Sequence, residues 1–223
     1  MQNNLRILST KKLQINQRDL LLHAGFRLIE ADFITVSPKS TDLSSVKEAL
    51  IFTSSNAVKS VMQSGEGKKL TGKPCFCVGK KTRLLLERYG FEVVLQKDYA
   101  TQLAEELTTV HRHRSFTFFC GNLRKNDLPE ALTESGIDFN EVEVYTTELT
   151  PSKIDTPLQG ILFFSPSGVR SFLKSNTISD AVCFCIGTTT AKPLEGLTRN
   201  IVIAYNTEIE SVIVAVAKHF KKI

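Results

Sequence analysis

The chain repeats two short motifs, and this repetition limits its possible folds more than any other feature. The segment Cys75–Thr82 returns 108 residues later as Cys183–Thr190, with Cys-Phe-Cys before a glycine in both copies. Upstream, Ile51–Val58 is echoed by Leu162–Val169. Each copy reads as an apolar strand, a small polar turn and the start of a helix. The repeat therefore predicts two similar α/β units.

The predicted elements alternate between strand and helix along most of the chain, which indicates α/β units with parallel sheets. The strands are continuous apolar runs, as expected for sheets covered on both faces. The expected strands are 5–9, 26–36, 50–53, 74–78, 91–95, 116–120, 141–147, 160–164, 181–186 and 201–204. Ligands of such sheets bind where the strands end. We therefore expect one large ligand, held by four loops between two domains.

The 223 residues fit one large domain or two of roughly 100 residues. Residues 24–26 match 135–137, so the N-terminal strand-helix-strand piece resembles residues 116–147. The two units are either sequential, or exchanged so that the N-terminal piece completes the C-terminal unit. The pattern alone leaves both arrangements open. Proline-ended strands at 34–38 and 146–151 would favour exchange, with 38–147 as an inserted domain.

Charge and hydropathy narrow the classes of function. The net charge is +5, but basic and acidic residues are interleaved, so a nucleic-acid stripe is not indicated. A modest positive balance suits a small polyanionic ligand. No stretch approaches 18 apolar residues, and the N-terminus lacks the apolar core of a signal peptide. We expect a cytoplasmic protein without a membrane partner.

The five cysteines are an odd number and predict no disulfide framework. Cys75 with Cys77, and Cys183 with Cys185, alternate along strands, so each pair faces one side of its sheet. Zinc needs about four converging ligands, and these pairs fall in different domains in either arrangement. We therefore expect core packing and no metal site.

Two loops of the first repeat carry candidate binding residues. Ser54, Ser55 and Asn56 stand between a strand and a helix, where they can cap the helix or bind an anion. Gly79 and Thr82, with two lysines between them, form the second loop. The spacing of a Walker loop is absent, as is the G-x-G-x-x-G fingerprint of dinucleotide sites.

The second repeat carries the counterparts of these loops. Ser165, Ser167 and Gly168 match the first loop, and the glycine lets the backbone come close to a ligand. Gly187, Thr189 and Thr190 match the second, with hydroxyls in the first helical turn. Pure capping and turn formation explain these residues almost as well as ligand binding does.

A third loop and a nearby strand complete the candidate site. Gly121, Asn122 and Arg124 follow the strand 116–120, and the guanidinium can hold a carboxylate in a bidentate pair. A solvated loop is the competing interpretation. Tyr145 lies near the end of the strand 141–147, where its phenol can donate a proton or simply pack.

In their order and spacing, these segments resemble the uroporphyrinogen-III synthase family. The segments are 52–58, 78–82, 121–124 with 144–147, and 164–169 with 186–191. The resemblance implies two flavodoxin-like domains with parallel sheets, joined by a two-stranded ribbon. It selects the exchanged arrangement, with one domain from residues 1–36 plus 149–223 and the other from residues 38–147.

The resemblance also implies a reaction. The substrate would be hydroxymethylbilane, an open-chain tetrapyrrole with eight carboxylates. Loss of its hydroxyl as water gives an azafulvene, and attack by the substituted carbon of ring D gives a spiro intermediate. Its fragmentation and reclosure invert ring D. The implied enzyme is a cofactor-free lyase and a monomer, which receives its substrate from hydroxymethylbilane synthase.

Within this family, the position of Tyr145 matches the tyrosine proposed to assist departure of the hydroxyl. The serine and threonine loops would bind carboxylates. The chain departs from the family at Ser9-Thr10-Lys11, where Thr-Arg-Pro is common, so no role is assigned to the first loop. It also has Thr188 where proline is frequent.

Three alternatives from other classes stay open at this point. A two-domain protein could close on a small polyanion without chemistry, a flavodoxin-like protein could bind flavin, and a regulatory protein could keep the fold with altered loops. Turnover would exclude a pure binding protein, and a colourless purified protein would argue against flavin. Retention of the site residues argues against a regulatory protein.

Overall fold

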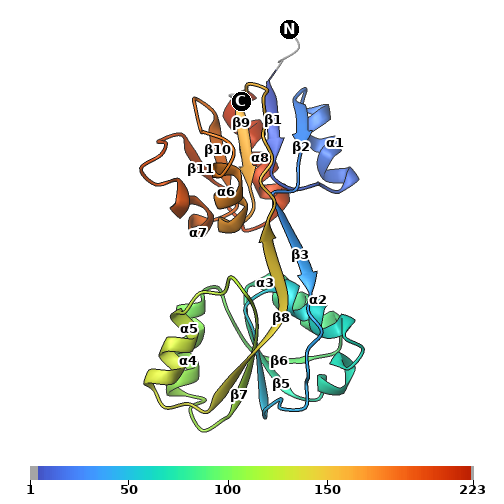
Figure 1. Ribbon diagram of the computed structural model, residues 1–223, viewed down its shortest axis with the longest axis vertical. Helices are drawn as coiled ribbons and strands as arrows, with labels where there is room; N and C mark the ends of the chain where they lie inside the picture. Colours follow the sequence, from blue (N-terminus) through green and yellow to red (C-terminus); the bar gives the residue numbers. More distant parts are fainter. Residues whose placement is uncertain (1–4, 222–223) are drawn as a thin grey trace. The chain divides into compact units, whose positions relative to one another are not determined.

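The computed structural model describes residues 5–221, and the chain folds into two compact units. Unit 1 contains the residues up to Thr35 and those from Glu148 onward, and unit 2 contains Val36–Thr147. Each unit is a sheet with helices on both of its faces (Figure 1). The predicted α/β fold class is confirmed.

Unit 1 holds a five-stranded sheet in the order β11-β10-β9-β1-β2, and all of its adjacent strands are parallel. Numbered within the unit, this order is 2-1-3-4-5 read from the other edge, the flavodoxin-like order. Its elements are β1 (Arg6–Ser9), α1 (Ile15–His23), β2 (Arg27–Glu30), β9 (Gly160–Phe163), α6 (Pro166–Leu173), β10 (Val182–Cys185), α7 (Thr188–Ala191), η2 (Lys192–Leu194), β11 (Ile201–Ile203) and α8 (Ile209–Lys221).

Unit 2 holds a six-stranded sheet in the order β3-β8-β7-β4-β5-β6. From β8 to β6 the strands are parallel and repeat the spatial order of unit 1, with β7 and β8 in the places of β1 and β2. Its elements are β3 (Ile34–Pro38), β4 (Ala49–Phe52), α2 (Ser55–Gln63), η1 (Gly67–Leu70), β5 (Pro74–Val78), α3 (Lys80–Arg88), β6 (Glu92–Lys97), α4 (Ala100–Thr109), β7 (Phe116–Gly121), α5 (Asp127–Glu134) and β8 (Phe139–Leu149).

The chain passes between the units twice, on β3 and β8, which pair with each other. The Lys39 amide donates to the Val144 carbonyl at 2.9 Å, and the Thr150 amide donates to the Phe33 carbonyl at 3.0 Å. As the residue numbers rise from 33 to 39, those of the hydrogen-bonded partners fall from 150 to 144, so these two strands run antiparallel. They form the two-stranded ribbon expected for this fold.

Each sheet separates two apolar cores. In unit 1, α6 and α7 cover one face and α1 and α8 the other. In unit 2, α2 and α3 cover one face and α4 and α5 the other. The strands are buried over most of their length because both faces are covered, which explains their uninterrupted apolar sequences.

All five cysteines are free and buried in these cores. Cys75 and Cys77 both face the core under α2 and α3, and Cys183 and Cys185 both face the core under α6. Within residues 5–221, no group of three or more His, Cys, Asp or Glu side chains gathers as metal ligands would. In the same range, no helix has the length and apolar character needed to cross a membrane.

The single strand expected over 26–36 is wrong, because the structure divides it into β2 and β3. At the break, the Ala31 amide donates to the Ser9 carbonyl and the Phe33 amide to the Thr10 carbonyl. Phe33 is fully buried and packs against Phe172. The chain therefore leaves the sheet of unit 1 after β2, buries the side chain of Phe33 and then enters the two-stranded ribbon.

Candidate functional site

The strand order reverses between β4 and β7 in unit 2, and between β9 and β1 in unit 1. Such switch points create crevices at the carboxyl edge of a sheet, the edge at which its parallel strands end. In unit 2 the flanking loops carry Ser54–Asn56 and Gly121–Arg124, and in unit 1 they carry Thr10 and Ser165–Gly168. Candidate residues from distant parts of the sequence thus gather at each switch point.

Tyr145 reaches the switch point of unit 2 through an irregularity in β8. The register pairs Cys120 with Glu143 but Gly121 with Tyr145, so Val144 is the extra residue of a β-bulge. Strict alternation would place Tyr145 on the face opposite Val142 and Val144. Because of the bulge, it packs against the same core as they do. Its ring is half-buried on the side covered by α2 and α3.

The Tyr145 phenol hydrogen-bonds the Ser54 side chain. Burial raises the pKa of Tyr145 above its ordinary value, the Ser54 hydrogen bond partly opposes this, and the Cys120 thiol adds to the rise. The phenol therefore keeps its proton at neutral pH and is available as a proton donor.

Asn122 and Arg124 are already engaged with protein groups. The Asn122 side chain accepts from the Thr147 amide at 2.8 Å and donates to the Thr147 carbonyl at 3.3 Å. Arg124 makes a two-bond pair with Glu141, its second bond being 2.8 Å long. These contacts fasten the β7–α5 loop to β8, so any carboxylate at Arg124 would compete with Glu141. A cavity of about 430 Å³ lies beside this pair.

The loop between β5 and α3 combines a special backbone with positive charge. Gly79 has φ of 85°, which L side chains rarely adopt, and it caps α3 without a side chain. Thr82 is buried, with its amide bonded to the Gly79 carbonyl at 3.1 Å. Lys80 and Lys81 are exposed, and neither forms an ion pair within the described part of the chain.

At the β4–α2 loop, the Ser54 hydroxyl caps α2 by accepting from the Asn56 amide at 3.1 Å. Ser55 and Asn56 occupy the first turn of that helix and are partly exposed. Free amides in a first helical turn favour anions.

The β9–α6 loop of unit 1 is a cluster of small polar groups. The Ser165 hydroxyl accepts from the Gly168 amide at 3.0 Å and lies 3.0 Å from the Ser167 hydroxyl. A Cβ on Gly168 would lie 3.3 Å from the Ser165 hydroxyl and 3.8 Å from that of Thr10. Thr10 itself donates to the Leu162 carbonyl at 2.6 Å. The first-strand loop, which the sequence left without a role, therefore borders this cluster.

The β10–α7 loop stands beside it along the same edge. Gly187 is extended, with φ of −173°, and the Thr190 amide donates to its carbonyl at 3.0 Å. Thr189 is exposed and Thr190 is buried. α7 contacts α6, so this loop and the Ser165 cluster are neighbours.

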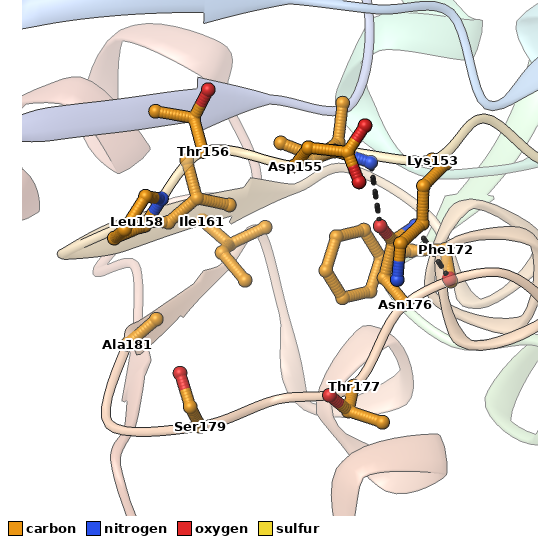
Figure 2. A pocket seen from close by; sticks show the side chains of 12 residues that line it. Lys153, Asp155, Thr156, Leu158, Ile161, Phe172, Asn176, Thr177, Ser179 and Ala181 are labelled. Carbon is orange, nitrogen blue, oxygen red and sulfur yellow. Dashed lines mark hydrogen bonds between the residues drawn. The ribbon is translucent and has the colours of Figure 1, made fainter.

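A second cavity lies at the opposite edge of the unit 1 sheet (Figure 2). It has a volume of about 300 Å³, and residues just before β9 and β10 line it. Asn176, on its wall, accepts from the Ile154 amide at 2.8 Å and donates to the Ser152 and Phe172 carbonyls. These bonds pin the segment after β8 to α6, so Asn176 serves the fold at this edge.

Comparison with known proteins bears on both family and fold. A family model described as uroporphyrinogen-III synthase HemD matches residues 18–213. No curated protein matches the chain.

Among solved structures, the uroporphyrinogen-III synthetase of Helicobacter pylori has a TM-score of 0.73 at 21% identity, covering 96% of this chain and 99% of that one. A mutant of the Thermus thermophilus uroporphyrinogen-III synthase has a TM-score of 0.72 at 13% identity, covering 98% and 100%. At these identities the structural likeness shows the fold.

Proposed function

The chain belongs to the uroporphyrinogen-III synthase family, whose reaction closes hydroxymethylbilane to uroporphyrinogen III, and we propose how its own residues carry that reaction. Tyr145 gives its proton to the departing hydroxyl of the bilane. The hydroxyls and amides at the two carboxyl edges bind the carboxylates of the substrate. One observation carries this assignment: a half-buried phenol that keeps its proton stands at the switch point of unit 2.

In the proposed first step, the phenol proton moves to the hydroxymethyl oxygen. The carbon–oxygen bond breaks, its electron pair leaves with the oxygen as water, and the pyrrole nitrogen supplies the electrons that form the azafulvene. Ring D then attacks through its substituted carbon. After the spiro intermediate has fragmented and reclosed, the last C–H proton returns to the Tyr145 phenolate, and the net change is loss of one water.

The proposed carboxylate ligands are groups that can bind anions without a buried cation. Hydrogen bonds to charged groups contribute about 1.5–3 kcal/mol each, so a few contacts hold an octacarboxylate firmly. Firm placement of ring D matters because the free bilane closes directly, without inversion, and positioning is what favours the spiro route. The proposed ligands are Ser55, Asn56, Gly79, Thr82, Ser165, Ser167, Gly168, Gly187, Thr189 and Thr190, and Ser54 contributes through the α2 terminus that it caps.

Gly121 contacts the Tyr145 ring, and Asn122 and Arg124 bond to Thr147 and Glu141 of β8, so these three residues hold the β7–α5 loop against the strand that carries Tyr145. We also propose that the protein acts in the cytoplasm as a monomer and needs no cofactor. In this proposal it receives hydroxymethylbilane from hydroxymethylbilane synthase.

The test is product analysis with freshly generated hydroxymethylbilane. The expected result is isomer III in proportion to the amount of protein, whereas isomer I alone at the spontaneous rate would reject the reaction.

Tyr145→Phe removes only the hydroxyl. Because general acids contribute about 10²–10⁴-fold, we expect kcat to fall by at least about 100-fold with the thermal midpoint unchanged. If this variant keeps the wild-type kcat, Tyr145 is not the proton donor. The overall reaction is tested separately by the product analysis.

A further inference from the structure

Beside Tyr145 lie a glycine whose small size is otherwise unexplained and the serine that caps α2. We propose that Gly121 and Ser54 are positioning residues for the Tyr145 phenol: Gly121 leaves the space in which the ring lies, and Ser54 turns the phenol proton away from the protein. This inference rests on the proposed role of Tyr145 and assigns the groups that hold it.

Gly121 lies directly under the ring. A Cβ on this residue would stand 2.4 Å from Tyr145 Cζ, 2.5 Å from Cε2 and 2.9 Å from Cε1. All three distances are shorter than any normal carbon–carbon contact. The backbone of Gly121 does not lie in the left-handed region, so an alanine could adopt its conformation. The glycine is therefore needed for the space it leaves rather than for its flexibility.

The bulge and the neighbouring asparagine fix the strand on both sides of the tyrosine. The extra residue Val144 turns Tyr145 toward Gly121. Two bonds from the Asn122 side chain to the backbone of Thr147 then hold β8 immediately after it. A methyl group at 121 would meet a ring whose backbone cannot move away, so the side chain itself must rotate off the site.

Ser54 controls the direction of the phenol proton. Its oxygen already accepts from the Asn56 amide at 3.1 Å, which leaves its own proton free to be donated. We infer that this proton goes to the Tyr145 oxygen, whose hydrogen bond with Ser54 lowers the pKa of the phenol. The phenol proton must then find another acceptor, and in the proposed reaction this acceptor is the departing hydroxyl. The same hydrogen bond stabilises the phenolate left behind.

The first test substitutes the glycine. Gly121→Ala is expected to lower kcat by about 100-fold, the usual effect of displacing a catalytic group by about 1 Å, while KM changes little. The fraction of isomer I should rise as the spontaneous closure competes. Gly72→Ala is the matched control, because a Cβ there meets nothing within 4 Å and its backbone is not left-handed.

The second measurement follows the phenol itself and needs no substrate. Burial raises the pKa of Tyr145 above the ordinary value of a tyrosine, so we expect one phenol to ionise late in an absorbance titration at alkaline pH. In Gly121→Ala the displaced ring should ionise at a lower pH than in the wild type. In Ser54→Ala it should ionise at a higher pH than in the wild type, because the donor to the phenolate is lost. The two variants thus shift the same signal in opposite directions.

Ser54→Ala is expected to lower kcat about tenfold, as for the loss of one hydrogen bond, and Ser54→Thr should restore both kcat and the titration. Wild-type titration of Tyr145 in folded Gly121→Ala and Ser54→Ala would overturn the proposal. If Tyr145→Phe is fully active but the titrations shift as expected, the positioning stands and only the role of the phenol in the reaction fails.

Discussion

At the scale of single residues, two glycines of unit 2 illustrate different constraints. Gly79 is needed for its backbone, because its φ of 85° is strained for other residues although nothing lies within 4 Å of its Cβ position. Gly121 is needed for space, because Tyr145 occupies the place of its side chain. The sequence marks both as glycines after strands, and only the structure separates the two reasons.

The buried thiols lead to a prediction about pH. Burial raises the pKa of Cys75, Cys77, Cys183 and Cys185 to about 12 and that of Cys120 to about 11. A raised acid pKa stabilises the fold below the unfolded value, near 9, and this stability is lost as the pH rises toward 12. We therefore expect that the native protein is not alkylated at pH 8, whereas all five cysteines are alkylated in urea. We also expect the urea midpoint of unfolding to fall above pH 9.

Replacing Cys183 with alanine should make that alkaline fall shallower, although the cavity lowers stability at every pH. An unchanged slope between pH 9 and pH 11, or rapid alkylation of the native protein, would contradict the burial of these groups as the cause.

At the scale of elements, one serine serves both a helix and the site. Ser54 and Ser165 occupy equivalent positions and cap α2 and α6. In both, the hydroxyl oxygen accepts a backbone amide, at 3.1 Å and 3.0 Å. Capping and ligand binding are therefore compatible, and a substitution must preserve one to test the other.

Ser165→Asp makes this separation. Aspartate caps helices as well as serine does, whereas Ser165→Ala should cost about 1 kcal/mol of unfolding free energy. The added carboxylate repels those of the substrate, so we expect KM to rise in Ser165→Asp while its urea midpoint stays at the wild-type value.

Ser179→Asp is the control, because it adds the same charge at the opposite edge of the same sheet, outside the proposed site. An equal rise of KM in both aspartate variants would show a general charge effect and argue against binding at Ser165.

At the scale of the whole molecule, charge governs the encounter with the substrate. The net charge of +5 is modest, and eight lysine and arginine side chains in the described part of the chain form ion pairs with acidic partners. Lys80 and Lys81 are exposed at the carboxyl edge of unit 2, where the proposed ligands lie, and form no ion pair among residues 5–221. Long-range attraction between exposed charges is screened by salt, with a Debye length of about 30 Å at 0.01 M and about 8 Å at 0.15 M.

We therefore expect KM for hydroxymethylbilane to rise several-fold over that range of ionic strength, and Lys80→Gln with Lys81→Gln to reduce the dependence. Lys68→Gln removes an exposed charge from η1 instead and should leave the dependence as it is. Equal KM values at low and high salt would show that short-range hydrogen bonds alone hold the bilane.

Local patterns in the sequence predict the α/β class, the order of elements, the two repeated units and the segments that resemble the family. These features are local: apolar runs, helix caps and glycine turns are encoded within about ten residues of each other. Most strand boundaries consequently lie within a residue or two of their expected positions, and the strand over 26–36 failed where burial of Phe33 interrupts it.

The folded arrangement determines which candidate residues meet and which already bind another protein group. Arg124 looked free until the fold brought Glu141 to it, and Thr10 had no role until β1 was placed beside β9. The bulge that turns Tyr145 toward Ser54 and Gly121 has no signature in the sequence. These contacts join residues up to about 150 positions apart, and because pairing across a sheet depends on every strand between them, no local pattern can specify it.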